Sequence, residues 1–187
     1  VKEYPPIHFL KVGKEYDSIV NKESFQYYLE RRKKHLEHFC TTIERCGIIL
    51  DLGSGTGGYL DSLKNYKRLI NIDLSFNSLI AKKEGNGNVS RINADILNIP
   101  LKNNSVDYIL LIGALHHVPG GLSKLFEEIL RVIKSGGSVF IDEANGYNLM
   151  WFLYMKLCKI DKVDTRPLFP YSIRNLAKKH GFVVQKG

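Results

Sequence analysis

A glycine-rich turn that follows an acidic residue is the part of this sequence best suited to chemistry. Residues 48–58 read Ile-Ile-Leu-Asp-Leu-Gly-Ser-Gly-Thr-Gly-Gly, so an apolar run leads to Asp51 and then to the turn. The apolar run predicts a buried parallel strand. The glycines allow left-handed backbone and leave no Cβ between the chain and a ligand. This pattern indicates a binding site for a nucleotide-like ligand, and we predict a helix over residues 59–65 directly after it.

The glycine spacing alone fits two kinds of nucleotide-like ligand. Gly53, Gly55 and Gly58 match the fingerprint of dinucleotide-binding turns, and Asp73 follows at about the distance expected of a ribose-binding acid. That interpretation would make the protein a dehydrogenase. The position of Asp51, two residues before the first glycine, and four later segments favour a different interpretation.

Together these segments resemble the class I S-adenosylmethionine-dependent methyltransferases. The first motif of that family, acid-x-Gly-x-Gly-x-Gly, stands here as Asp51, Gly53, Gly55 and Gly57. Four further segments are similar to the second to fifth strands of the family and their ends, in the family's order: Arg68–Asp73, Val89–Ile96, Ser105–Ile112 with the turn Leu115-His116-His117-Val118, and Glu128–Gly137 leading to Ser138–Asp142. The turn after the fourth strand resembles that of many small-molecule members, and the resemblance extends over about residues 48–184.

The resemblance implies a fold, a cofactor and a set of contacts. The implied fold is α/β, a Rossmann-like, doubly wound, mostly parallel sheet, and the implied cofactor is S-adenosylmethionine. The residues expected to bind this cofactor are Asp51, Gly53, Ser54, Gly55, Thr56, Gly57, Asp73, Leu74, Ala94, Asp95, Ile96 and Ile112.

Four acids in this region each end an apolar run: Asp51, Asp73, Asp95 and Asp142. If the strands are parallel, these carboxylates line one crevice at the carboxyl edge of the sheet. Such a crevice suits a cationic sulfonium and ribose hydroxyls, whereas a pyrophosphate would need the opposite charge. Capping of a helix or turn is the alternative for each acid. We expect Asp107 to be a turn or strand-start residue.

Methyl transfer from a sulfonium requires little chemical assistance beyond orientation of the acceptor and exclusion of water. A base is needed only where the acceptor must lose a proton. His116 and His117, just past the fourth strand, are the candidate catalytic residues, because imidazole titrates near neutral pH. Asp142 and Glu143 are competing candidates for the base, and packing of the two histidines is the alternative. No histidine and cysteine spacing indicates a metal site.

The acceptor is less well defined. The sequence lacks the Asn/Asp-Pro-Pro-aromatic motif of exocyclic-amine methyltransferases and the Pro-Cys motif of cytosine-5 enzymes. We predict a small-molecule or lipid- or glycan-like acceptor methylated on O, N or C. The net charge of +8 leaves an RNA-directed methyltransferase as an alternative, although the run Arg31-Arg32-Lys33-Lys34 is better explained as a solvated helix face. A non-catalytic cofactor-binding scaffold subunit is the third hypothesis.

An apolar segment, residues 148–160, follows the fifth predicted strand and contains Trp151, Phe152 and Tyr154. It is too short to cross a bilayer. We expect a buried lid helix or a dimer contact. Docking on a membrane surface, aided by Lys156, Lys159 and Lys162, is the alternative.

The remaining elements complete one domain of 187 residues, with an N-terminal helical cap over 1–47 and the cofactor-binding part over 48–187. Predicted helices lie near Glu23–Arg45, Ser75–Glu84, Ser123–Ile133 and Ser172–His180, with Ser75 and Ser123 as N-caps. Tyr16, Tyr27 and Tyr28 are candidate ligand contacts of the cap.

The last predicted strand is Phe182–Gln185, the sixth. The family's final antiparallel strand has no counterpart after it, so we expect a trimmed chain or a fragment. The three cysteines, Cys40, Cys46 and Cys158, are odd in number and follow no secretory signal, which indicates reduced thiols in a cytoplasmic protein.

Overall fold

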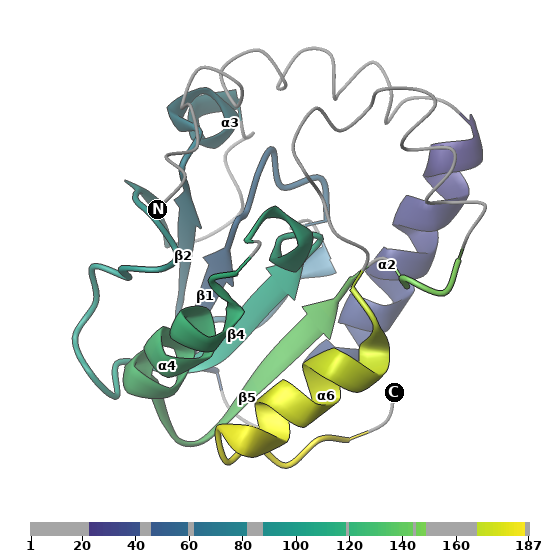
Figure 1. Ribbon diagram of the computed structural model, residues 1–187. Helices are drawn as coiled ribbons and strands as arrows, with labels where there is room; N and C mark the ends of the chain where they lie inside the picture. Colours follow the sequence, from purple (N-terminus) through teal and green to yellow (C-terminus); the bar gives the residue numbers. More distant parts are fainter. Residues whose placement is uncertain are drawn as a thin grey trace.

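Five parallel strands form the centre of the molecule (Figure 1). The computed structural model describes residues 23–41, 46–59, 62–81, 88–118, 120–143, 145–148 and 168–185. The strand order is β3-β2-β1-β4-β5. The strands are β1 (Ile48–Leu52), β2 (Arg68–Asp73), β3 (Val89–Asn93), β4 (Val106–Ile112) and β5 (Ile133–Asp142). Because the chain runs outward from β1 to β3 and then returns to β4 on the other side of β1, the order reverses between β1 and β4, where open α/β sheets bind ligands.

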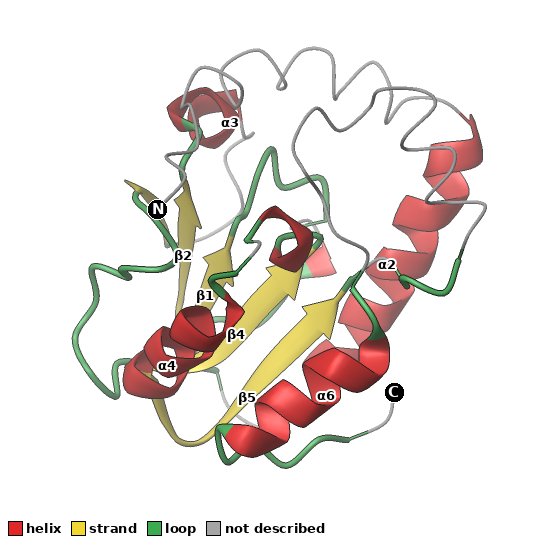
Figure 2. Ribbon diagram, viewed as in Figure 1, coloured by secondary structure: helices red, strands yellow, loops and turns green. Residues whose placement is uncertain are grey.

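Helices cover both faces of this sheet (Figure 2). On one face, α4 (Leu122–Val132) buries Leu125 and Ile129 in the same apolar cluster as Leu50 and Leu111, and α6 (Pro170–Lys179) packs at the border of that cluster. On the other face, Leu36 of α2 (Glu23–Thr41) shares a cluster with Ile49 of β1 and Leu110 of β4. The predicted doubly wound α/β architecture is therefore confirmed.

The sequence signals at helix starts are confirmed in one case and wrong in another. Ser75 precedes α3 (Phe76–Ala81), and its Oγ accepts a hydrogen bond of 3.2 Å from the backbone N–H of Ser78, as expected of an N-cap. Ser123 is not an N-cap, because α4 begins at Leu122 and Gly121 occupies the capping position. The Ser123 hydroxyl instead lies 3.3 Å from Nε2 of His180.

The predicted helix over 59–65 is wrong in the described residues of that range. The Ser62 backbone N–H donates to the Tyr59 carbonyl at 3.1 Å, and Ser62 has 3-10 geometry. Residues 63–65 are not helical, and Asn65 has a left-handed φ of 59°. The chain therefore turns toward β2. In addition, the Tyr59 side chain is buried against the sheet, where its hydroxyl contacts Asp51.

The predicted sixth strand, Phe182–Gln185, is also wrong, because no strand forms there. The Phe182 backbone N–H donates to the carbonyl of Ala177 and so closes the end of α6 instead of joining a ladder. Its ring packs edge-on against Phe126, with centroids 6.0 Å apart. Phe182 thus attaches the end of α6 to α4, while Val183, next in sequence, is 91% exposed.

The fifth strand begins earlier than predicted, at Ile133 instead of Ser138, and it bulges between these residues. Asp107, at the start of β4, accepts hydrogen bonds from the Ile48 backbone N–H at 2.8 Å and from Lys134 Nζ at 2.8 Å. It thus joins the starts of three strands at the edge of the sheet opposite the glycine-rich turn, which agrees with the structural role expected for it.

Candidate active site

The glycine-rich turn lies at the carboxyl end of β1, against the ends of β2 and β4. The backbone N–H groups of Gly53 and Ser54 both donate to the carbonyl of Ile72, at 2.9 and 3.1 Å. Gly53 has a φ of 69°, and a Cβ there would lie 2.7 Å from the Cβ of Ala114. Gly55 has a φ of 49°, and a Cβ there would meet no atom within 4 Å. One glycine is therefore required by packing, whereas the other borders open space.

Asp73, the last residue of β2, holds the turn in place. Its Oδ2 accepts a 2.7 Å hydrogen bond from the backbone N–H of Gly55, and its Oδ1 accepts one of 2.7 Å from that of Ser75. A carboxylate has about four acceptor sites. Asp73 can therefore support the turn and still accept hydrogen bonds from ribose hydroxyls.

Asp51 lies deeper than the other predicted contacts. It is fully buried in β1, beside Asn71 of β2 in the parallel register, and its Oδ1 accepts a 3.0 Å hydrogen bond from the Tyr59 hydroxyl. Ser54, in the turn itself, is 2% exposed, and its hydroxyl has no hydrogen-bond partner among the described residues. A buried hydroxyl at this position is a suitable donor or acceptor for a ligand bound over the turn.

The predicted adenine-side residues follow β3 at the same edge. The Ala94 backbone N–H donates to the carbonyl of Asp73 at 3.2 Å, which brings the two segments together. Asp95 accepts a 2.8 Å hydrogen bond from the Leu97 backbone N–H, so its carboxylate also stabilises a turn. Leu74 is 52% exposed, whereas Ile96 is buried. On the β4 side, Ile112 is buried beside the same edge.

A short 3-10 helix, η2 (Leu115–His117), follows β4 and faces the glycine-rich turn through Ala114. It is bound to the end of β5 by Glu143. The Glu143 Oε2 accepts a 2.9 Å hydrogen bond from the Leu115 backbone N–H, and its Oε1 lies 2.7 Å from Nδ1 of His116. The rings of His116 and His117 are in contact, with centroids 4.0 Å apart. The structure therefore brings together both predicted histidines and one of the two competing acids.

Asp142, the other competing acid, is engaged by α2. Arg32 Nε lies 3.2 Å from Asp142 Oδ1, with both side chains largely buried, and His35 Nδ1 lies 3.5 Å from Oδ2. The guanidinium also covers the end of β4, because a Cβ at Gly113 would lie 3.1 Å from two of its nitrogens. The solvated-face interpretation of the basic run is therefore wrong for Arg32. Its position one turn before the buried Leu36 was the signal available in the sequence.

Several predicted contacts cannot be placed. Tyr16 and the apolar segment 148–160 beyond Asn148 lie outside the described residues, as do the side chains of Tyr27 and Tyr28. No helix in the described parts of the chain is long and apolar enough to cross a membrane.

The sheet order, the glycine-rich turn and the acids at or near the carboxyl ends of β1, β2 and β3 are those of a class I S-adenosylmethionine-dependent methyltransferase fold. A family model described as a methyltransferase domain matches residues 50–141, which supports this class. The open space beside Gly55, the buried Ser54 hydroxyl and the acceptor capacity of Asp73 fit the cofactor of that class.

Curated relatives agree with this assignment. The chain is 28% identical to a demethylmenaquinone methyltransferase of Bacillus licheniformis, in an alignment that covers 79% of this chain and 68% of that protein. It is 30% identical to the demethylmenaquinone methyltransferase of Staphylococcus aureus, in an alignment that covers 79% of this chain and 65% of that protein. The chain thus spans about two thirds of the length of these relatives.

Solved structures agree on the fold. A methyltransferase from Archaeoglobus fulgidus superposes with a TM-score of 0.69 at 20% identity, covering 87% of this chain and 75% of that one. A methyltransferase from Methanosarcina mazei superposes with a TM-score of 0.64 at 18% identity, covering 78% and 84%. At such identities the likeness extends to the fold alone.

Proposed function

We propose that this chain transfers a methyl group to a small-molecule acceptor, and that a quinol ring is the first acceptor to test. The observation that carries the proposal is the contact between the two turns, in which Gly53 packs on Ala114 and the cofactor turn therefore lies beside the turn that holds His116. The demethylmenaquinone methyltransferases among the relatives support a quinone-type acceptor. A quinol is the better nucleophile of the redox pair, because its ring is electron-rich and its hydroxyls can lose a proton.

S-Adenosylmethionine, when bound, supplies an electrophilic methyl on a sulfonium. The residues proposed to hold it are those of the glycine-rich turn, with Asp73 accepting from ribose hydroxyls and Asp95 and Ile96 bordering the adenine. Buried Asp51 accepts a hydrogen bond from the Tyr59 hydroxyl and in this way supports the end of the turn. The chain's main contribution is orientation, which can supply up to roughly 7–11 kcal/mol in well-held reactions.

His116 is the proposed proton acceptor, and His117 packs against it. The His116 ring is 21% exposed, whereas the carboxylates of Asp142 and Glu143 are 13% and 4% exposed and bonded to neighbouring groups. An acceptor hydroxyl can therefore reach the imidazole more readily than either carboxylate.

Calorimetric titration with S-adenosylmethionine and its demethylated product tests the cofactor half of the proposal. We expect saturable binding by the chain and a loss of at least about 100-fold in affinity for Asp73→Ala, because the change removes both the support of the turn and the ribose acceptor. Asp107→Ala is the matched control. It removes an acid from the opposite edge of the same sheet, so it should lower stability but leave affinity within about 3-fold.

The acceptor half is tested by supplying the chain and the cofactor with demethylmenaquinone in its quinol form and following the methylated product by mass spectrometry. Methylation of the quinol but not of the oxidised quinone would support the proposal. Steeply salt-dependent RNA retention without quinol methylation would instead favour the RNA-directed alternative. A folded chain that binds neither cofactor form would contradict both the enzyme proposal and the cofactor-binding scaffold hypothesis. Cofactor binding without transfer to any acceptor would instead favour the scaffold.

A further inference from the structure

We infer that Glu143 is the positioning residue for His116 and fixes the tautomer that accepts a proton. The inference concerns a residue 27 positions away in sequence from His116, which reaches it only because β4 and β5 are neighbours. Its catalytic consequence rests on the proposed function, whereas the tautomer itself is a property of the folded chain and can be measured without cofactor or acceptor.

The Glu143 carboxylate bonds both the backbone and the side chain of one turn. Its two oxygens contact adjacent residues of η2, Oε2 at 2.9 Å from the Leu115 nitrogen and Oε1 at 2.7 Å from Nδ1 of His116. The side chain is only 4% exposed, so water competes little for these contacts. A carboxylate held at two points in this way fixes both the position of η2 and the rotation of the imidazole.

This arrangement determines which imidazole nitrogen carries the proton. An ionised carboxylate only accepts hydrogen bonds, so Nδ1 must be the donor. In the neutral ring Nε2 then carries the lone pair and is the basic atom. The same logic orients the histidine in the Ser-His-Asp triad, where the acid holds the tautomer and remains ionised.

Methyl transfer is coupled to proton transfer to His116. The acceptor hydroxyl loses its proton to Nε2 of His116, and the electron pair left on the acceptor forms the bond to the methyl carbon, either from the oxygen itself or from a ring carbon conjugated with it. A ring carbon that takes the methyl group then loses its own hydrogen as a proton to water, which restores the aromatic ring. The carbon–sulfur bond breaks, and its pair stays on sulfur. The resulting imidazolium lies against the Glu143 carboxylate, which offsets its charge until the proton is released to water.

Glu143→Gln tests this inference because glutamine keeps the shape of the side chain but has one acceptor oxygen instead of two. The Leu115 N–H can only donate, so the glutamine oxygen should turn toward it and the amide NH2 toward Nδ1 of His116. Nδ1 must then accept, and the proton moves to Nε2. We expect nitrogen-15 NMR spectra of the folded, ligand-free chain to show His116 protonated on Nδ1 in the wild type and on Nε2 in the variant.

The kinetic consequence is a loss in kcat of roughly 100- to 10,000-fold for Glu143→Gln, the range that a positioned acid–base group supplies, with the KM for the cofactor changed by less than about 3-fold. Glu128→Gln is the matched control, because Glu128 also bonds one backbone N–H and one side chain but lies in α4, outside the candidate site. It should change neither the His116 spectrum nor kcat.

Three results would overturn the inference. The first is an Nε2-protonated His116 in the wild-type chain, a result that does not require the variant to fold. The second is an unchanged tautomer in Glu143→Gln. The third is a Glu143→Gln variant in which the His116 proton moves to Nε2 while kcat, on an acceptor that the wild type methylates, stays within about 3-fold of the wild-type value. Failure of the proposed function would appear differently, as absence of transfer to every acceptor while the tautomer follows the identity of residue 143.

Discussion

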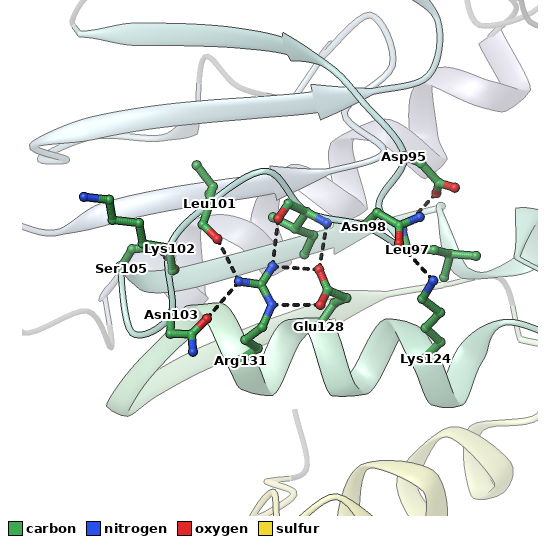
Figure 3. Close-up of polar contacts among 11 residues, drawn as sticks. Asp95, Leu97, Asn98, Leu101, Lys102, Asn103, Ser105, Lys124, Glu128 and Arg131 are labelled. Atoms are coloured by element: carbon green, nitrogen blue, oxygen red, sulfur yellow. Dashed lines mark hydrogen bonds and ion pairs between the residues drawn. The ribbon is translucent and has the colours of Figure 1, made fainter.

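Two glutamates in this protein make the same pair of contacts in different places. Glu128, in α4, accepts a 2.7 Å hydrogen bond from the Ile99 backbone N–H and is bonded by Arg131 at 2.7 and 2.8 Å (Figure 3). Glu143, at the carboxyl edge of the sheet, accepts from the Leu115 N–H and pairs with His116. The second partner is the difference. A guanidinium keeps its proton at every relevant pH, whereas an imidazole exchanges its proton near neutrality.

The side chain paired with each glutamate determines the role of its carboxylate. Arg131 also donates to the carbonyls of Ile99 and Leu101, each at 2.7 Å, and thereby attaches the connection between β3 and β4 to α4 (Figure 3). Its hydrogen bonds hold the pKa of Glu128 below its usual range, and Glu128 raises the pKa of Arg131 in return. We call the Glu128–Arg131 pair a charge lock, because both groups stay charged near neutral pH and together hold the connection between β3 and β4 on α4. The pair at η2 instead contains a group that can take up a proton and release it.

The largest expected effect separates the two pairs by kinetics. His116→Asn places an amide nitrogen near the position of Nδ1, so the contact with Glu143 can persist while Nε2 is removed. We expect kcat to fall roughly 100- to 10,000-fold. In that background Glu143→Gln should cost less than about a further 3-fold, because no imidazole remains to be positioned. Single-turnover rates of the two single variants and the double variant measure this coupling.

Glu128→Gln provides the control for this cycle, since it should behave additively with His116→Asn. A full additional loss for Glu143→Gln in the His116→Asn background would contradict the positioning role. It would mean that Glu143 acts through the Leu115 backbone, as Glu128 does through Ile99, and that the two pairs are alike.

A smaller effect is expected for the charge lock. Arg131→Ala removes hydrogen bonds to two backbone carbonyls and to Glu128, and should lower the free energy of unfolding by about 1.5–3 kcal/mol, since bonds to charged groups are among the stronger ones. Urea denaturation measures this change. The kcat at saturating cofactor should stay within about 3-fold, and a catalytic loss as large as that of His116→Asn would show that the lock and the site are not separate.

The strands and the candidate bases could be predicted from the sequence, whereas the contact between His116 and Glu143 could not. The apolar runs correctly predicted β1, β2 and β4 and the edge at which Asp51 and Asp73 lie, because burial on both faces of a parallel sheet leaves a strong local signal. β3 has no fully buried residue, so the position of Asp95 was predicted from the family resemblance instead. His116 and Glu143 were both predicted as candidates for the base, but as competitors. Their pairing depends on the register in which Ile112 lies beside Asp142, a long-range feature without a local pattern.

The errors have related causes. Phe182–Gln185 alternates in burial like a strand, but its backbone closes α6 instead. Arg32 was grouped with its charged neighbours, although helical periodicity places it on the same face as Leu36. In both cases the deciding contact is made with a distant element, Phe126 of α4 for one and Asp142 of β5 for the other.

The smallest expected effect concerns pH. Because Arg131 lowers the folded-state pKa of Glu128 below its unfolded value, the folded chain binds fewer protons than the unfolded chain between these two pKa values. The stabilisation is therefore present above the unfolded pKa, about 4.3 for glutamate, and is lost as the pH falls through the folded pKa. The pair is partly open to water, so its contribution should be under about 1 kcal/mol. Urea denaturation of the wild type and of Glu128→Gln from pH 6 down to the acid limit of folding should give a shallower loss of stability for the variant. Glu127→Gln, which changes an exposed acid of the same helix, should follow the wild-type curve, and equal slopes for all three proteins would contradict the assignment of a charge lock to Glu128.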